Sequence, residues 1–402
     1  MMYYVLAAVG LLFVIQLLYL FLVYKLASSR PSPEGKGDES PLVDDGAGEG
    51  LPRLSVIIPA CNQDYLLRQN LPAVLEQDYP DFEVIVVDDN STDETADILQ
   101  QLQYRYPRLR TTFVPPTSRR ISHRKLALTL GIKAATGDWL VFTDADCRPA
   151  GNLWLRSLVG QSSDHCSLIT DNSNCDAVVG FTGVETSRGL GALVRRFDTQ
   201  LRGLRLLGLA ARGRAHMAYG TNMMYRRSIF FDAKGYSSHL NLERGDDDIF
   251  VNEHIAPRRI RAAVTPEARV VCTDTSRRHW RLERMGRLAT RRHLRGVQKA
   301  LLTFDSLTRV LYIIGTLAAI VMAVVLRREF ALWWVIVVAA AVLWVVRYVL
   351  SLLVWNRSAR ALGDASYGAA LPVLMPLQMF AALGLRVRYV FTSKQRYRRK
   401  QL

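Results

Sequence analysis

The chain has 402 residues, of which 50% are hydrophobic and 22% are charged, a mixture typical of apolar segments joined to a soluble domain. Its net charge of +16 requires an anionic partner, which could be lipid, nucleic acid or a phosphorylated substrate. The five cysteines are odd in number and include no CxxC pair, which argues against a zinc site and indicates reduced thiols.

The N-terminal segment is predicted to be a membrane helix. Residues Val5 to Tyr24 form an apolar run that is long enough to cross a bilayer. Because no basic segment precedes this run and no small-residue cleavage site follows it, we expect a membrane helix within 1–27 rather than a signal peptide. Lys25 and Arg30 follow, so the positive-inside rule places the next segment in the cytoplasm. Residues 28–50, rich in Pro, Gly, Ser and acids, are expected to form a flexible linker.

From Leu51 the pattern changes to short apolar runs that alternate with helical segments. The runs LSVIIPA, FEVIVVDDN and WLVFTDAD predict buried strands, and the segments 64–77, 92–103 and 124–135 predict helices. This alternation predicts a parallel sheet covered by helices, in a domain that we place at 51–300. Ligands of such folds bind where the strands end, and the motifs described below lie at those ends.

The C-terminal part of the chain returns to a membrane-like composition. Residues 301–356 predict a transmembrane hairpin, with spans at 307–326 and 331–355. A last apolar stretch at 367–391 is broken by two prolines and leads to a basic tail. Because a full span would place this tail outside, against the positive-inside rule, we expect an interfacial or re-entrant helix within 357–402.

Two carboxylates, Asp144 and Asp146, directly follow the strand predicted at WLVF. A turn there can let one carboxylate bind a metal ion directly, while the other reaches the ion through water or sugar hydroxyls. Oxygen ligands favour Mg²⁺ or Mn²⁺, whose open positions the diphosphate of a nucleotide would fill. An acidic surface turn without a ligand is the alternative.

Acids also stand at two other places in the predicted domain. Asp88 and Asp89 end a buried strand, where they would contact a base or ribose, or cap the helix that follows. Asp246, Asp247 and Asp248 are consecutive, and their repulsion should raise the pKa of one of them, which suits a general base. A helix cap is again the alternative.

These three acidic motifs, in this order, resemble the family 2 glycosyltransferases with the GT-A fold, over roughly Leu51 to Arg287. Two further segments are similar to family motifs: KLALTLG, which begins at Lys125, and GTNMMYR, which contains Asn222. The resemblance implies a Rossmann-like, mostly parallel α/β sheet covered by helices. Together with the apolar runs and the positive-inside rule, we expect this domain in the cytoplasm, with one N-terminal and two to three C-terminal membrane helices.

The resemblance implies a role for each matching residue. Asp89 would contact the nucleotide base beside Pro59, and Asp144 and Asp146 would hold the metal ion, the diphosphate and the donor sugar. Asp247 would deprotonate the acceptor hydroxyl, so that the sugar is transferred with inversion, and a one-residue slip would give this role to Asp246 or Asp248. The residues expected to bind the nucleotide-sugar are Pro59, Asp88, Asp89, Lys125, Asp144, Asn222 and Arg284.

Two segments depart from the family pattern. Cys61 stands where many relatives have a tyrosine, which leaves this motif without an aromatic ring to stack on the base. Glu283 and Gly286 stand where the Q-x-x-R-W motif of processive synthases has Gln and Arg, which argues against a chain-extending synthase. Arg281 or Arg284 is still expected to reach the diphosphate.

Two basic segments indicate where the positive charge acts. Between Gly189 and Arg214, apolar residues recur at helical spacing with arginines between them. This amphipathic helix either packs on the sheet with a solvated basic face or lies on anionic lipid beside the acceptor site. Residues 277–299 carry nine Lys and Arg against one acid just before the membrane hairpin, a position that favours anionic membrane lipids and argues against nucleic acid as the partner.

We therefore expect a multi-pass, metal-dependent glycosyltransferase of a bacterial inner membrane, with its catalytic domain in the cytoplasm. The donor would be a nucleotide-sugar and the acceptor a lipid-linked or envelope glycan. Two alternatives remain. One is a polyprenyl-phosphate glycosyltransferase, whose acceptor is the phosphate itself, and the other is a non-catalytic membrane scaffold with a decayed transferase domain.

Overall fold

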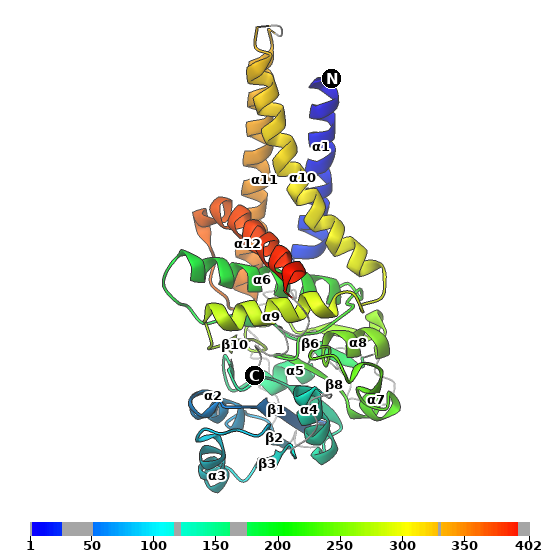
Figure 1. Ribbon diagram of the computed structural model, residues 1–402, viewed down its shortest axis with the longest axis vertical. Coiled ribbons are helices and arrows are strands. Elements are labelled where there is room, and N and C mark those ends of the chain that lie inside the picture. The colour runs from blue at the N-terminus through cyan, green and yellow to red at the C-terminus, as the bar shows by residue number, and fades with distance from the viewer. Residues whose placement is uncertain (1, 26–50, 116–121, 161–174, 329–330, 393–402) are drawn as a thin grey trace, which may run out of the picture.

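The computed structural model describes residues 2–25, 51–115, 122–160, 175–328 and 331–392. Figure 1 shows an α/β domain at one end, three long helices projecting at the other, and helices that cross the molecule between them. The projecting helices are α1 (Met2–Tyr19), α10 (Val297–Val325) and α11 (Trp333–Ala361), and the crossing helices are α6 (Leu190–Ala210), α9 (Arg277–Thr290) and α12 (Leu371–Phe391). The predicted linker at 28–50 lies outside the described residues, as does the end of the basic tail.

A seven-stranded sheet forms the centre of the α/β domain. Its strands lie in the order β3 (Leu109–Phe113), β2 (Phe82–Asp88), β1 (Leu54–Ala60), β4 (Trp139–Phe142), β8 (Met223–Arg226), β6 (Ala177–Val179) and β9 (Ile260–Ala262). The first four strands are parallel to one another, and β8 is antiparallel to both of its neighbours. The predicted α/β fold with a mostly parallel sheet is confirmed.

Helices cover both faces of this sheet, because alternate residues of a strand point to opposite sides. Ile57 of β1 belongs to the same core as Leu128, whereas Val56 and Ile58 belong to the core that contains Leu67. The three helices predicted between the strands are α2 (Asp64–Leu75), α3 (Thr95–Arg105) and α4 (His123–Ala134). Helix α3 begins three residues later than predicted.

The late start of α3 has a local cause. The backbone N–H of Thr92 donates to Oδ1 of Asn62 over 2.7 Å, and the N–H of Ser91 donates to Oδ1 of Asp88 over 3.1 Å. Asp93 Oδ1 accepts from the N–H of Thr95 over 3.1 Å. Side-chain oxygens thus accept from the backbone N–H groups that open the helix, and residues 91–94 form a turn before it.

Four described helical segments are long and apolar enough to cross a membrane: Tyr4–Tyr24, Thr303–Val325, Trp333–Ala361 and Leu371–Phe391. The first three correspond to the predicted N-terminal helix and hairpin. The fourth is α12, which packs on α6 and α9 and crosses the molecule in Figure 1 instead of running beside α11. Nε2 of Gln378 in α12 donates to Oδ1 of the buried Asp198 in α6 over 2.8 Å.

A buried polar cluster links the membrane helices to α6. Asp305 of α10 accepts from Tyr24 (2.6 Å), from Arg309 (2.8 Å) and from Arg205 of α6 (2.5 Å). A buried carboxylate is stable only when such donors surround it. The two backbones also approach closely here, because a Cβ on Gly208 would lie 1.7 Å from the carbonyl oxygen of Val23. Only glycine fits this contact between α6 and the N-terminal segment.

Three arginines of the basic face predicted between Gly189 and Arg214 are ion-paired within the protein, so the interpretation as a solvated face is corrected for them. Arg196 pairs with Asp364 over 2.7 Å, Arg202 pairs with Glu283 of α9 over 2.9 Å, and Arg205 pairs with Asp305. Periodicity identified the helix and its arginine-bearing face, but the helices that cover this face come from later parts of the chain. These arginines therefore join α6 to α9, to α10 and to the segment that follows α11.

Candidate active site

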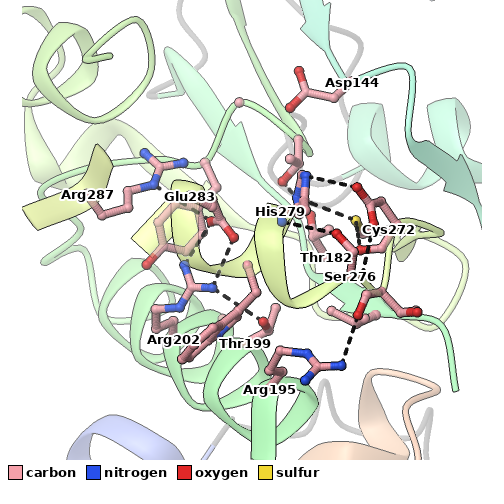
Figure 2. Close-up of a pocket in the computed structure, with 18 of the residues that line it drawn as sticks. Asp144, Thr182, Arg195, Thr199, Arg202, Cys272, Ser276, His279, Glu283 and Arg287 are labelled. Atoms are coloured by element: carbon pink, nitrogen blue, oxygen red, sulfur yellow. Dashed lines mark hydrogen bonds and ion pairs between the residues drawn. The ribbon is translucent and has the colours of Figure 1, made fainter. Parts of the chain in front are cut away.

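A pocket, here called the central pocket, lies where the ends of the sheet strands meet α6 and α9. Its lining includes Arg124, Asp144, Arg202, Tyr219, Asp247, Asp274, His279 and Arg287. Figure 2 shows Asp144 at one side of this pocket, His279 beside Cys272, and Arg202 beside Glu283. The pocket therefore brings together parts of the chain that lie far apart in the sequence.

The two acids of the TDAD motif make different contacts. Asp144 lines the central pocket, and its Oδ1 accepts from Nη2 of Arg124 over 2.8 Å. Asp146 is buried, and its carboxylate lies 3.4 Å from Nδ1 of His279 and 3.4 Å from Sγ of Cys272. The second of these acids is the one surrounded by potential metal ligands.

The carboxylate of Asp146 forms a candidate metal site with Asp274 and His279. One ligand atom from each of the three residues lies within 4.8 Å of the other two. Burial raises the pKa of Asp146, as expected for a carboxylate that a nearby imidazole only partly compensates. Two carboxylates and an imidazole fit a divalent cation such as Mn²⁺. Cys147 and Cys272 also lie close to Asp146. Both are free cysteines that stand opposite each other in the neighbouring strands β5 (Cys147–Pro149) and β10 (Val270–Cys272).

Arg124 and His279 were missed by sequence reasoning. Nε of Arg124 donates to Asp246 over 3.1 Å while its Nη2 donates to Asp144, so one guanidinium joins two of the acidic motifs. His279 lies far beyond Asp146 in the sequence. A single sequence gives no spacing signal that would connect either residue with the acids.

The three consecutive acids separate into three environments. Asp246 contacts Arg124, Asp247 lines the central pocket, and Asp248 accepts a hydrogen bond from Oγ1 of Thr290. Helix α8 (Asp248–His254) begins at the third acid, with Asp247 as its N-cap. The helix-cap interpretation therefore holds for Asp247, but this residue also faces the pocket.

Four donors surround the carboxylate of Asp247. Nη1 of Arg287 and the N–H of Asp248 donate to Oδ1 over 2.7 and 2.6 Å, and Nη2 of Arg287 and the N–H of Gly220 donate to Oδ2, both over 2.7 Å. A carboxylate has about four lone-pair positions, so all of them are occupied. Burial opposes the charge, but Arg287 and the Gly220 N–H lower the pKa of Asp247 to about 2.

Repulsion among the acids does raise the pKa of one of them, as the sequence indicated. Burial and the neighbouring charge of Asp247 raise the pKa of Asp248 to about 6. Asp248, however, lines a second pocket beside the central one. The acid with the raised pKa and the acid in the central pocket are therefore different residues.

The residues predicted to contact the base lie at the ends of neighbouring strands. Pro59 belongs to β1 and pairs in register with Val87 of β2, and Asp88 ends that strand. Oδ1 of Asp89 lies 3.0 Å from Nδ1 of His123. Asp88 also accepts the N–H of Ser91 that closes the turn before α3, so one of its oxygens already has a structural partner.

Three residues predicted to bind the donor have other partners within the protein. Lys125 is buried, and its Nζ donates to the carbonyl of His239 over 2.6 Å. The side chain of Asn222 donates to two backbone carbonyls and accepts from the indole of Trp154. Arg284 contacts Asp198 over 3.1 Å and lines the second pocket. Arg287, one turn later in α9, is the arginine that reaches the central pocket.

Comparison with known proteins shows which family the N-terminal part of the α/β domain resembles. Residues 55–232 match the family described as Glycosyl transferase family 2. Over 101 residues the chain is 36% identical to the probable glycosyltransferase YdaM of Bacillus subtilis. This aligned region is 25% of this chain and 24% of that protein. Over 96 residues it is 33% identical to GalNAc(5)-diNAcBac-PP-undecaprenol beta-1,3-glucosyltransferase of Campylobacter jejuni. This aligned region is 24% of this chain and 30% of that protein.

One solved structure is similar over nearly the whole chain. The mannosyltransferase PcManGT from Pyrobaculum calidifontis, in complex with GDP-Man and Mn²⁺, superposes with a TM-score of 0.53 at 19% identity, over 96% of this chain and 98% of that chain. The chain spans only about a quarter to a third of the length of the curated relatives named above. Residues 55–232 therefore belong to a family 2 glycosyltransferase domain, as predicted, and the chain has a GT-A-like fold.

Proposed function

We propose that this protein transfers a sugar, with inversion, from a nucleotide-sugar to a lipid-linked or envelope glycan acceptor at the membrane surface. One observation carries the proposal: the central pocket is lined by Asp144, Asp247, Asp274 and His279, with Asp146 buried beside the last two, and residues of the crossing helices α6 and α9 also line it. A donor diphosphate and an acceptor from the membrane could both reach such a pocket.

The donor half of the site would contain a divalent cation, Mg²⁺ or Mn²⁺. Asp146, Asp274 and His279 would hold it, and a cation there supplies charge neutralisation for the diphosphate leaving group. Asp144 faces the same pocket and is oriented by Arg124, so it is the candidate contact to the donor sugar or diphosphate. Asp89 and Pro59, at the ends of β2 and β1, are the proposed contacts to the nucleotide base.

The acceptor half would use Asp247. Of the three consecutive acids, this one lines the central pocket, and its low pKa keeps it ionised at neutral pH. To take a proton from an acceptor hydroxyl, one of its oxygens must first lose a donor. Arg287 is the donor able to move, because the other two are backbone N–H groups.

The full occupancy of Asp247 also supports a second candidate function, a polyprenyl-phosphate glycosyltransferase. A phosphate acceptor is already ionised and needs no general base, so Asp247 could remain bonded to Arg287 throughout. Asp247 would then orient the arginine toward an anionic substrate instead of moving a proton.

We place the protein in a bacterial inner membrane with its catalytic domain in the cytoplasm and its basic residues near anionic lipids. The rule that cytoplasmic flanks are positive supports this, because Lys25 follows the first span. In spheroplasts, an impermeant thiol reagent should label an Arg328→Cys variant at the hairpin turn but leave the exposed native Cys61 unlabelled until lysis. Labelling of Cys61 before lysis would contradict the orientation.

Binding of nucleoside diphosphates tests the proposed activity directly. The purified full-length protein should bind one member of a panel of nucleoside diphosphates at least about tenfold more tightly with Mn²⁺ than with chelator, as expected when the cation bridges ligand and protein. Calorimetry measures both affinities. A scaffold with a decayed domain would bind none of them under either condition.

A further inference from the structure

The second pocket, here called the arginine pocket, lies on the membrane side of the central one. Its volume is about 130 Å³. Its arginines come from three crossing helices or their ends: Arg202 and Arg205 from α6, Arg284, Arg287 and Arg291 from α9 and its C-cap, and Arg386 from α12. Ser306 of α10 completes it on the membrane side, whereas Asp248 is the one acid in its lining.

Not all of this positive charge is neutralised within the protein. Arg202, Arg205, Arg284 and Arg287 each pair with a carboxylate. Arg291 and Arg386 form no ion pair in the part of the chain that the structure describes; Arg291 donates to the hydroxyl of Thr303. Burial, followed by the nearby positive charges of Arg386 and Arg205, lowers the pKa of Arg291. The two unpaired guanidinium groups therefore repel one another across the pocket, a cost that a bound anion would remove.

A buried polar atom supports the same interpretation. His216 lines the arginine pocket and is 4% exposed, and its Nδ1 has no hydrogen-bond partner among the described residues. A buried ring nitrogen without a partner is costly. An anionic oxygen in this pocket could accept a hydrogen bond from it.

The position of the pocket indicates the source of the anion. Ser306 belongs to the apolar segment Thr303–Val325, and Arg386 belongs to the apolar helix α12. Figure 1 shows α6, α9 and α12 between the α/β domain and the projecting helices, which is the level of lipid headgroups if those helices cross the membrane. Arg202, Tyr219 and Arg287 line both pockets, so an anion held in the arginine pocket lies next to the place where Asp247 faces the donor.

We propose that the arginine pocket, through Arg291 and Arg386, binds the phosphate or diphosphate group of a membrane-lipid acceptor and so delivers the acceptor's nucleophile to the central pocket. The inference rests on the proposed function, since it names the class of acceptor for the same site. It gives a function to the positive charges of Arg291 and Arg386, which the transfer reaction itself does not explain.

Binding of a lipid phosphate tests the proposal without measuring transfer. The full-length protein in phosphatidylcholine nanodiscs, with chelator present to keep phosphate out of the cation site, is titrated with a short polyprenyl phosphate, the matching polyprenyl alcohol, and inorganic phosphate. The lipid phosphate should bind at least about tenfold more tightly than either of the others, since hydrogen bonds between charged groups are the stronger ones. Equal binding of the alcohol, or equally tight inorganic phosphate, would overturn the proposal.

The variants Arg386→Gln and Arg291→Gln should each weaken binding of the lipid phosphate by about 10- to 100-fold. Arg388→Gln is the matched control, because Arg388 is also exposed on α12 and its replacement removes the same charge, but it does not line the pocket. An equal loss in the control would mean a general surface-charge effect and would overturn the assignment. Nucleoside diphosphate binding with Mn²⁺ is measured on the same samples. If it fails in the unmodified protein, the proposed function fails, whatever the lipid result.

Discussion

Replacement of Asp146 by asparagine should remove the cation-dependent part of nucleotide binding. Asn keeps the size of the side chain but loses the charge, and a hard cation depends on that charge. Even residues that only support a metal ligand commonly cost about 10- to 100-fold in affinity, so a direct ligand should cost about 100-fold or more. Calorimetric titration of nucleoside diphosphate in Mn²⁺ and in chelator, for both proteins, measures the difference.

Three comparisons make the Asp146 experiment specific. With chelator, wild type and variant should bind with similar weak affinity, because the variant lacks only the cation's contribution. His279→Gln should reproduce the loss, since His279 belongs to the same cluster. Asp144→Asn should lower cation-dependent affinity less, because its carboxylate contacts Arg124 and stands outside that cluster. Loss at Asp144 without loss at Asp146 would show that the cation site is misassigned.

Local patterns in the sequence were sufficient to predict three central strands of the sheet and the long apolar helices. The run FEVIVVD is apolar on both faces, and the strand it forms is buried for six of its seven residues. The spans predicted at 307–326 and 331–355 agree with α10 and α11, because an apolar run of about twenty residues has the length that a bilayer-crossing helix needs. Such features depend on neighbouring residues alone, which a sequence displays directly.

The candidate site was predictable only where its residues lie in one motif. Asp144 and Asp146 were found because they directly follow a predicted strand, and Asp247 because it lies in a run of three acids that resembles a family motif, whereas Arg124, His279 and Arg287 carry no local signal. Lys125 and Asn222 fit family motifs, yet their side chains bond to backbone carbonyls inside the domain. Motif matching identifies a segment, but it does not say whether the side chain faces ligand or core.

Asp247→Asn should lower turnover with a hydroxyl acceptor by about 10² to 10⁴, the usual contribution of a general base, while donor affinity changes little. The structure sharpens the comparison with its neighbours. Asp246 contacts Arg124, and Asp248 contacts Thr290 and lines the arginine pocket, so neither is placed to take a proton in the central pocket. Donor affinity and turnover are measured side by side for Asn substitutions at all three positions.

The acceptor decides how the Asp247 result is interpreted. If a hydroxyl acceptor is used, Arg287 must release an oxygen of Asp247 before proton transfer, and loss of the carboxylate removes a step that occurs only in the transition state. If a polyprenyl phosphate is used, no proton has to be removed, and Asp247→Asn should keep most of its turnover while its affinity for the acceptor falls through the misplaced Arg287. Near-normal turnover with a hydroxyl acceptor, combined with a large loss at Asp246 or Asp248, would move the base by one residue. Near-normal turnover in all three variants would reduce the motif to a helix cap with two arginine contacts.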